Sequence, residues 1–454
     1  RIDAAGATFA FPLLDLWRVK YQEVEPSVTF NYQSIGSGGG VKNHIEKTVN
    51  FGATDAPLTD AEYGAAPGTI TIPEMIGAIS IAYNIEGVKG LNLSEEALCG
   101  MFLGTITNWS DGVIAKDNPN AELPDAEIVT VHRSDGSGTT FAFTSYLSKT
   151  CPAWDEQVGA AKSVPWPVGL GSPGNEGVAG TIRSTDNSVG YVTLAYAFQN
   201  DMETANIQNG DHTNFVEPSI ETASAASGSA AFWLPGAEES WRDVDLLAAP
   251  GFNSYPITSF SYLILHPDLG EVRSIDDRAQ AQAVIDMIAW MITDGQQYSP
   301  QLLYVPVADT VSNIGLKGLA QITYNGEKLY TGATSVWESD TSSGAIDDSI
   351  ADLHAQYADG VIDQSTFLHL MAQIAELYEL YEQDLIDDDR LADALANMIQ
   401  PSTVRIEDAS AGDGGTIDDW VRVTAGWWVD GLVSDAEFLA SIEYLIERGV
   451  ITIR

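Results

Sequence analysis

Residues 28–42 read VTFNYQSIGSGGGVK, an apolar stretch that is followed by a glycine-rich turn. The β-branched and aromatic residues at 28–32 predict a short strand, and Val41, Ile45 and Val49 recur at helical spacing beyond the turn. The segment therefore predicts a strand that ends in a turn and continues into a helix. A helix start carries unpaired N–H groups and a partial positive charge, so this turn is a candidate site for a small anion.

The same succession of strand and helix recurs through residues 1–330. Strands are predicted at residues 51–54, 76–83, 128–131 and 260–266, and a helix at residues 279–292. Such alternation predicts an α/β fold with a mainly parallel sheet, whose ligands bind beyond the carboxyl ends of the strands. The turn at Gly36 and the turn after Arg133 both follow predicted strand ends.

Two further segments place small residues and hydroxyls at a predicted helix start. Ala7-Thr8-Phe9 precedes Pro12, and residues 133–140 read RSDGSGTT. Three helix starts that converge with one arginine would surround a ligand with hydrogen-bond donors. We therefore predict a site for a tetrahedral oxyanion.

Composition bounds the class of protein. The chain has 454 residues, of which 64 are acidic and 21 basic, and its net charge is −43. This balance argues against nucleic acid as a partner, because that interaction depends on Lys and Arg. The carboxylates are spread over the whole length, as on a surface adapted to salt. Since the Debye length is roughly 8 Å at physiological salt, distant carboxylates hardly oppose a local anion site.

Two features bear on location. No apolar run reaches the roughly 18–20 residues that span a bilayer, and a chain that begins with Arg1 is expected to be a mature, processed product. Cys99 and Cys151 are the only cysteines, and they fit either two buried thiols or one disulfide. We favour a disulfide, since both would fall in one lobe of the architecture given below, and an extracytoplasmic location.

The C-terminal part of the chain differs in composition. A linker rich in Ser, Thr, Asp and Gly is predicted at residues 331–348, followed by an acidic helical extension at residues 349–454. The extension repeats a helix, Asp-Gly turn, helix pattern at residues 357–368 and 428–439. The turns partly match a calcium-binding loop, but carboxylates are missing from its first and third places, so we predict packing hairpins and no metal site. Residues 420–446 resemble a short helical module of secreted archaeal proteins.

Several long motifs identify a family. Residues 6–9 read GATF, residues 32–42 read YQSIGSGGGVK and residues 51–57 read FGATDAP. The likeness continues through residues 133–140, 166–171, 189–192 and 256–259. In this order, over about residues 4–330, the chain resembles the periplasmic phosphate-binding protein of the high-affinity phosphate ABC transporter. The resemblance implies a type II periplasmic-binding-protein fold, in which two α/β lobes joined by a hinge close on one phosphate without a cofactor.

The resemblance also implies which residues bind phosphate: Thr8, Phe9, Ser37, Gly38, Asp55, Arg133, Asp135, Ser137, Gly138 and Thr139. Arg133 would donate two charge-assisted bonds and be held in place by Asp135. Asp55 would accept the O–H that phosphate keeps near neutral pH. Sulfate has no such hydrogen and would meet an unpaired carboxylate, which would exclude it.

Plainer interpretations of these residues remain open at this point. Asp55 could cap a helix that begins at Pro57, Arg133 could form a surface ion pair, and Ser37 could lie in a flexible loop. His132 stands where the family often has a second arginine, and we expect it to be a neighbour of the site rather than a ligand.

We predict lobe I at residues 1–80 and 256–330, lobe II at residues 84–253, and a hinge near residues 80–84 and 253–256. The predicted function is an extracytoplasmic solute-binding protein, not an enzyme, that captures inorganic phosphate and delivers it to an ABC permease. One alternative is a surface-layer-associated structural or phosphate-scavenging protein, and we hypothesise that the extension attaches the chain to a surface layer or to another copy. A phosphate-ester hydrolase is the other alternative, although the chain lacks Walker, Gly-x-Ser-x-Gly and His-Glu-x-x-His motifs.

Overall fold

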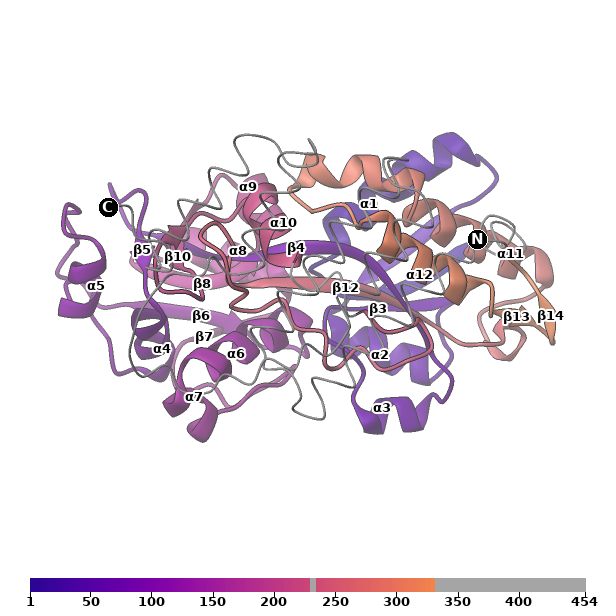
Figure 1. The fold of residues 1–454 in the computed structure, drawn as a ribbon, viewed down its shortest axis with the longest axis horizontal. Helices are drawn as coiled ribbons and strands as arrows, with labels where there is room; N and C mark the ends of the chain where they lie inside the picture. The colour runs from indigo at the N-terminus through magenta and orange to yellow at the C-terminus, as the bar shows by residue number, and fades with distance from the viewer. Residues whose placement is uncertain (229–233, 331–454) are drawn as a thin grey trace, which may run out of the picture.

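The computed structural model describes residues 1–228 and 234–330, which form an elongated α/β molecule around one twisted sheet (Figure 1). Its nine strands follow the order β2-β1-β3-β12-β4-β8-β6-β7, and β9 pairs with β4. Their bounds are β1 (Ile2–Gly6), β2 (Phe30–Ser34), β3 (Phe51–Thr54), β4 (Ile70–Asn84), β6 (Val129–Arg133), β7 (Leu170–Ser172), β8 (Ser188–Thr193), β9 (Glu203–Thr204) and β12 (Thr258–Leu265). Smaller sheets contain β5 (Asn92–Leu93), β10 (Asn206–Gln208) and β11 (Phe215–Val216), and β13 (Thr323–Tyr324) with β14 (Glu327–Lys328).

The prediction of a mainly parallel sheet is wrong for the centre of the molecule. At one end β1 runs parallel to β2 and β3, and at the other β6 runs parallel to β7 and β8. Between them, β12 is antiparallel to β3 and β4, and β4 is antiparallel to β8. Strand direction depends on which strands become neighbours, and local sequence patterns do not encode this.

Strand β4 joins the two halves of the sheet. It pairs with β12 from Ile70 to Ala78 and with β8 from Ile79 to Asn84. The later segment that leads into β12 lies beside the position where β4 changes its partner, because the Tyr255 hydroxyl donates to the Ile79 carbonyl at 2.9 Å. All but the last of its 15 residues are buried, as in a strand covered on both faces.

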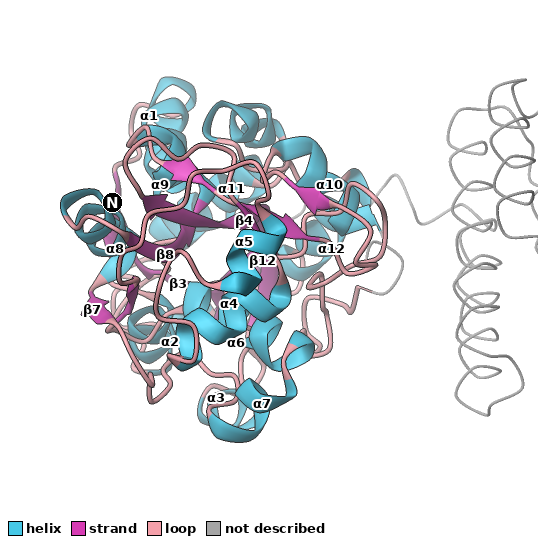
Figure 2. Cartoon of the chain, turned by 90° about the vertical axis from the view of Figure 1, so that its left-hand side faces the viewer, coloured by secondary structure: helices cyan, strands magenta, loops and turns pink. Residues whose placement is uncertain are grey.

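Helices surround the central strands (Figure 2). They are α1 (Phe11–Val24), α2 (Ser37–Ile45), α3 (Asp60–Ala65), α4 (Glu95–Leu103), α5 (Gly112–Asp117), α6 (Gly138–Thr150), α7 (Pro152–Gln157), α8 (Gly174–Ser184), α9 (Leu194–Gln199), α10 (Ile220–Gly228), α11 (Arg278–Met291) and α12 (Asp309–Leu319). Helix α2 ends earlier than the spacing predicted, because Lys47 adopts a left-handed conformation (φ 57°) and places Val49 outside the helix. No helix within the described residues is long and apolar enough to cross a membrane.

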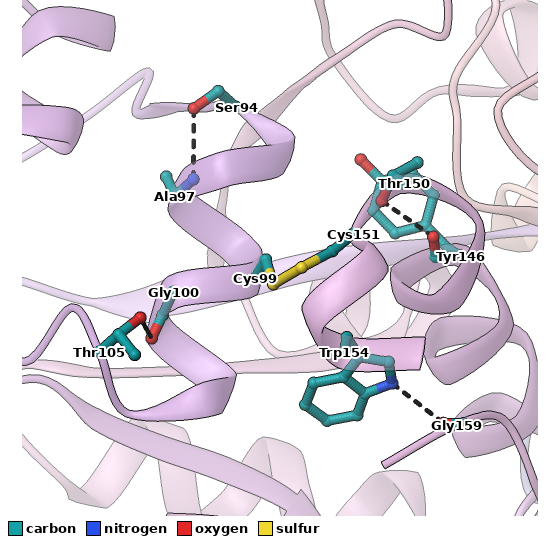
Figure 3. Close-up of a disulfide and its surroundings, with 10 residues drawn as sticks. All are labelled: Ser94, Ala97, Cys99, Gly100, Thr105, Tyr146, Thr150, Cys151, Trp154 and Gly159. Carbon is teal, nitrogen blue, oxygen red and sulfur yellow. Dashed lines mark hydrogen bonds between the residues drawn. A yellow bond between two sulfur atoms is a disulfide. The ribbon is translucent and has the colours of Figure 1, made fainter. Parts of the chain in front are cut away.

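Cys99 of α4 and Cys151 form a disulfide, so the prediction of a bond rather than two thiols is confirmed (Figure 3). Cys151 lies at the junction between α6 and α7, so the bond ties that junction to α4. The predicted linker, the helical extension and its repeat lie outside the described residues.

One segment of the predicted lobe II range packs on the half of the sheet that contains β12. The Thr71 amide donates to the Ala237 carbonyl at 2.7 Å, and the Trp241 ring packs against those of Phe260 and Tyr262. Residues 237–242 therefore pack against the other half of the molecule, although they follow most of the lobe II range in sequence.

Candidate functional site

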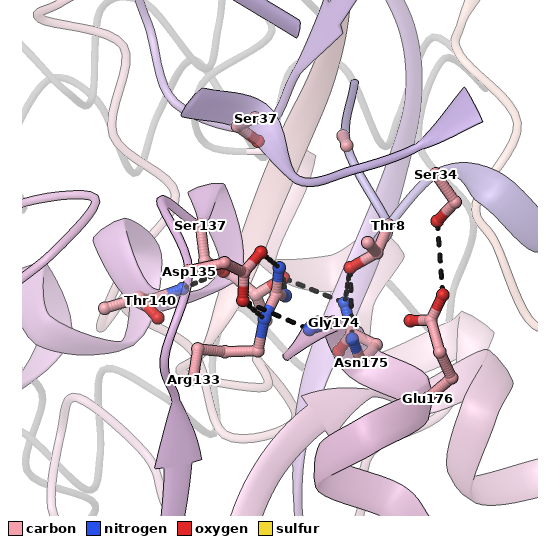
Figure 4. Close-up of polar contacts among 12 residues, drawn as sticks. Thr8, Ser34, Ser37, Arg133, Asp135, Ser137, Thr140, Gly174, Asn175 and Glu176 are labelled. Carbon is pink, nitrogen blue, oxygen red and sulfur yellow. Dashed lines mark hydrogen bonds and ion pairs between the residues drawn. The ribbon is translucent and has the colours of Figure 1, made fainter. Parts of the chain in front are cut away.

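Three predicted helix starts meet in space. Helices α1, α2 and α6 begin at Phe11, Ser37 and Gly138, as the sequence predicts. The Gly38 amide donates to the Gly136 carbonyl at 2.9 Å, which holds the start of α2 against the loop before α6. Figure 4 shows the loops that carry these starts around Arg133.

Glycines allow this close approach. Gly36 has φ +82°, and a Cβ atom there would collide with the Asp135 carboxylate. A Cβ atom on Gly138 would lie 2.6 Å from both the Asp55 Cβ and the Ser37 Oγ. The site therefore needs glycine at these two positions because backbone from one segment touches side chains from another.

Arg133 lies at the carboxyl end of β6 with a side chain that is 1% exposed, so its interpretation as a surface ion pair is wrong. Its Nε and Nη2 donate to the two oxygens of Asp135 at 2.7 and 2.5 Å (Figure 4). Burial pushes the pKa of Asp135 up, but the hydrogen bonds and charge of Arg133 outweigh it and hold that pKa below its usual range. The Asp135 carboxylate fixes the plane of the guanidinium group. The remaining nitrogen, Nη1, is directed toward Thr139, with its Oγ1 at 3.5 Å.

Asn175, at the start of α8, links hydroxyls from two of these segments. Its Nδ2 donates to Thr8 Oγ1 at 2.8 Å (Figure 4) and also to Thr139 Oγ1 at 3.1 Å. Because both oxygens accept from Asn175, the hydrogens of both hydroxyls remain available as donors. Asn175 was not among the residues predicted from the sequence, although the small residues at 171–175 (GSPGN) mark one more helix start after a strand.

Backbone amides complete the set of donors. Within the described residues, no hydrogen-bond acceptor takes the amide hydrogens of Phe9, Gly138 or Thr139, although all three residues are buried. The Ser137 hydroxyl accepts from the Thr140 amide at 3.0 Å and caps α6 one turn further on. A buried amide without a partner costs about 1–3 kcal/mol, so these groups point to an anionic ligand.

Asp55 follows β3 and is 2% exposed. Its Oδ2 accepts from the Ser37 hydroxyl at 3.2 Å and its Oδ1 from the Ser261 hydroxyl at 3.1 Å. Burial raises the pKa of Asp55 to about 7, although Ser261, Arg133 and Ser37 all act to lower it.

The plainer interpretations of Asp55 and Ser37 are wrong. The next helix, α3, begins at Asp60 and is capped by Thr59, so Asp55 caps no helix at Pro57. Ser37 is fully buried and forms the first residue of α2, so it does not lie in a flexible loop.

Tyrosines hold the backbone around the site. The Tyr196 hydroxyl donates to the Thr8 carbonyl at 2.8 Å, the Tyr304 hydroxyl donates to the Phe9 carbonyl, and the Arg133 amide donates to the Tyr191 hydroxyl at 3.0 Å. None of the three tyrosines was predicted to have this role, because a tyrosine within an apolar segment has no local pattern that indicates it.

His132 is turned toward an aromatic neighbour. Its ring stacks on Trp166 with centroids 4.6 Å apart, and its Nδ1 hydrogen-bonds with the Arg133 carbonyl at 3.0 Å. Among the residues that the structure describes, no group of three or more His, Cys, Asp or Glu side chains could hold a metal ion.

Comparison with known proteins first defines the class. Residues 1–294 match the family model of the PBP superfamily domain. The fold is also similar to that of the phosphate-binding protein from Stenotrophomonas maltophilia, with a TM-score of 0.53 at 18% identity over 71% of this chain and 99% of that one.

Sequence relatives define the family. The chain is 40% identical over 317 residues to the phosphate-binding protein PstS of Pasteurella multocida, covering 68% of this chain and 87% of that protein. It is 35% identical over 339 residues to the PstS protein of Methanocaldococcus jannaschii, covering 71% and 86%. The chain belongs to the PstS family of phosphate-binding proteins. The resemblance and the two-lobed fold class predicted from the sequence are confirmed.

Proposed function

We propose that this protein captures inorganic phosphate and delivers it to an ABC permease, acting as a solute-binding protein and not as an enzyme. The observation that carries the proposal is the grouping of buried donors at one place. Within the described residues, three amides have no acceptor, and they lie on the same helix starts as two threonine hydroxyls and the buried Arg133 guanidinium. Asp55 lies against Gly138 of this group. The names of the PstS relatives support phosphate as the anion.

The proposed ligand contacts follow from this geometry. Phe9, Gly138 and Thr139 would donate through their amides, and Arg133 would add charge-assisted bonds that contribute roughly 1.5–3 kcal/mol each. Asp55 would accept the O–H of a protonated phosphate. The remaining members of the proposed set are Thr8, Ser37, Gly38, Asp135 and Ser137.

The proposal includes closure of two lobes, at residues 1–80 with 256–330 and at residues 84–253, about a hinge near residues 80–84 and 253–256; residues 237–242 of the second range pack on the first lobe. The change of partner along β4 and the nearby Tyr255 bond support a hinge at this place. Polar contacts that cross between the two ranges support burial of the ligand on closure. They include Thr8 with Asn175, Ser34 with Glu176 at 3.3 Å and Glu62 with Lys162 at 2.6 Å.

An extracytoplasmic location is also part of the proposal. The disulfide between Cys99 and Cys151 supports it, because such bonds persist in oxidising compartments. We assign the acidic extension to attachment at a cell-surface layer or to self-association. Size-exclusion chromatography of a chain truncated after Tyr330 tests this, and unchanged oligomerisation and surface retention would contradict it.

Calorimetric titration with phosphate, sulfate and arsenate in parallel tests the main proposal. We expect phosphate to bind with micromolar or tighter affinity, roughly −8 kcal/mol or beyond. Incubation with a generic phosphate ester should release no product. Absence of phosphate binding, or turnover of the ester, would overturn the proposal.

A further inference from the structure

A second buried carboxyl group, that of Glu74, is connected to Asp55 through the hydroxyl group of Ser261. Glu74 of β4 is fully buried, and its Oε1 lies 2.9 Å from the Ser261 Oγ of β12. The same Ser261 Oγ lies 3.1 Å from Asp55 Oδ1. Within the described residues, Glu74 Oε2 has no hydrogen-bond partner. Neither the family resemblance nor the proposed function uses Glu74.

The groups that face Glu74 offer it no positive charge. Asp55 after β3, Tyr32 of β2 and Tyr304 ahead of α12 interact with it electrostatically, and Ser261 hydrogen-bonds with it. No ion pair among residues 1–228 and 234–330 includes Glu74. An isolated buried carboxylate is costly, so such a group takes up a proton instead. Burial raises the pKa of Glu74 to about 8, and the charge of Asp55 adds to the shift.

The number of available hydrogens decides which groups donate among Ser261, Asp55 and Glu74. The Ser261 hydroxyl has one hydrogen but contacts two carboxyl groups, so two ionised carboxylates would leave one contact as an unpaired approach of two oxygens. With the proton on Glu74, Glu74 donates to Ser261 and Ser261 donates to Asp55, and every contact is satisfied. The charge of Arg133 acts to lower the pKa of Asp55 but is absent from the groups acting on Glu74. The ionised form is therefore favoured at Asp55 and the protonated form at Glu74.

We propose that Glu74 is a positioning residue: while protonated it donates through Ser261 and keeps Asp55 a charged acceptor for phosphate, and loss of its proton weakens phosphate binding. This inference rests on the proposed function. Ionisation of Glu74 would add a second negative charge to the same buried cluster and reverse the direction of the Ser261 hydrogen bond. Asp55 would then lose a donor at the side that faces away from the ligand.

Calorimetry on the full chain at about pH 7.5, between the pKa values of Asp55 and Glu74, and at about pH 9 tests the proposal with wild type, Glu74→Gln and a matched control, Glu122→Gln, at an exposed carboxyl. Glutamine keeps a hydrogen-bond donor beside Ser261 at every pH. Ionisation of phosphate is common to all three proteins and cancels in the comparison. We expect the Kd of wild type and Glu122→Gln to rise between the two pH values by about tenfold more than the Kd of Glu74→Gln, the effect of one pKa unit. Equal pH dependence of Glu74→Gln and wild type would overturn the proposal.

An infrared measurement separates this proposal from the proposed function, because it needs no ligand. A carboxylic-acid C=O band that is present at about pH 7.5 in wild type, is lost by about pH 9 and is missing from Glu74→Gln would support a protonated Glu74 even if phosphate did not bind. Absence of that band in folded wild type would overturn the proposal even if phosphate bound tightly. Circular dichroism of Glu74→Gln establishes that the variant is folded in both measurements.

Discussion

Two aspartates at the site, Asp135 and Asp55, occupy opposite electrostatic surroundings. Asp135 is held by two bonds from Arg133, and its pKa lies below the usual range. Among the residues that the structure describes, Asp55 accepts from two serine hydroxyls and lies near the buried Glu74, and its pKa is raised to about 7. One side of the site thus supplies a rigid positive group with its partner, whereas the other supplies carboxyls whose charge depends on protons. An anion that itself carries a proton suits both sides.

Replacing Arg133 with alanine removes the guanidinium that holds Asp135 and should have the largest effect on phosphate affinity. Loss of two charge-assisted bonds, at roughly 1.5–3 kcal/mol each, predicts about 100-fold to 10,000-fold weaker phosphate binding in calorimetry. The control is Arg18→Ala, since Arg18 lies within α1, beyond its first turn, and forms an exposed pair with Asp15. Retention of wild-type affinity by Arg133→Ala would remove the basis of the proposed site.

Asp55→Asn tests the proton-dependent half. The amide can no longer repel an anion that lacks a hydrogen, so the preference for phosphate over sulfate should fall by about tenfold to 100-fold. Parallel titrations with the two anions give this ratio directly. If sulfate is still excluded equally, selectivity does not come from the carboxylate.

Asn175→Ala tests the contacts by which Asn175 connects Thr8 with Thr139. Without the Asn175 amide, the hydroxyls of Thr8 and Thr139 lose the donor that orients them, and about tenfold weaker phosphate binding is expected from one lost buried hydrogen bond. The effect should appear mainly in the dissociation rate, which stopped-flow measurement of phosphate release would resolve. An unchanged rate would mean that the hydroxyls are positioned by other groups.

A further prediction concerns stability without ligand. The folded-state pKa of Glu74 is raised above its unfolded value, so the folded protein binds more protons, and stability falls as pH rises from about 4.5 to about 8. Glu74→Gln removes this loss, so its melting temperature relative to wild type should increase between about pH 5 and pH 9, by about 2–4 °C for each kcal/mol. Differential scanning fluorimetry would measure it, and a difference that does not vary with pH would contradict an elevated pKa.

Asp135 should act in the opposite direction on stability. Its lowered pKa contributes stability above the unfolded value, and this contribution is lost as pH falls through the folded value. The stabilising contribution of Asp135 beside Arg133 is therefore lost in acid, whereas ionisation of the buried carboxyls Asp55 and Glu74 lowers stability in alkali.

Much of the candidate site's local structure could be predicted because its parts are close together in sequence. Each glycine- and serine-rich turn directly follows a strand, and Asp135 lies two residues from the arginine it pairs with, so short motifs contain both the helix starts and the ion pair. The strands at residues 51–54 and 128–131 were predicted for the same reason, within two residues of β3 and β6. Cysteine count and predicted lobe assignment were enough to favour the disulfide.

Sequence by itself therefore determined the local elements and the chemistry of each turn, since backbone preferences and hydrogen-bond donors belong to short segments. Only the tertiary structure decided that β4 and β12 run antiparallel, that Asn175 reaches Thr8, and that Ser261 stands between Asp55 and Glu74. Ser261 and Glu74 are 187 positions apart, and their contact arises from the order of strands in the sheet. A buried acid within an apolar strand shows its partner only when the neighbouring strand is known, because burial and pairing are properties of the packed chain.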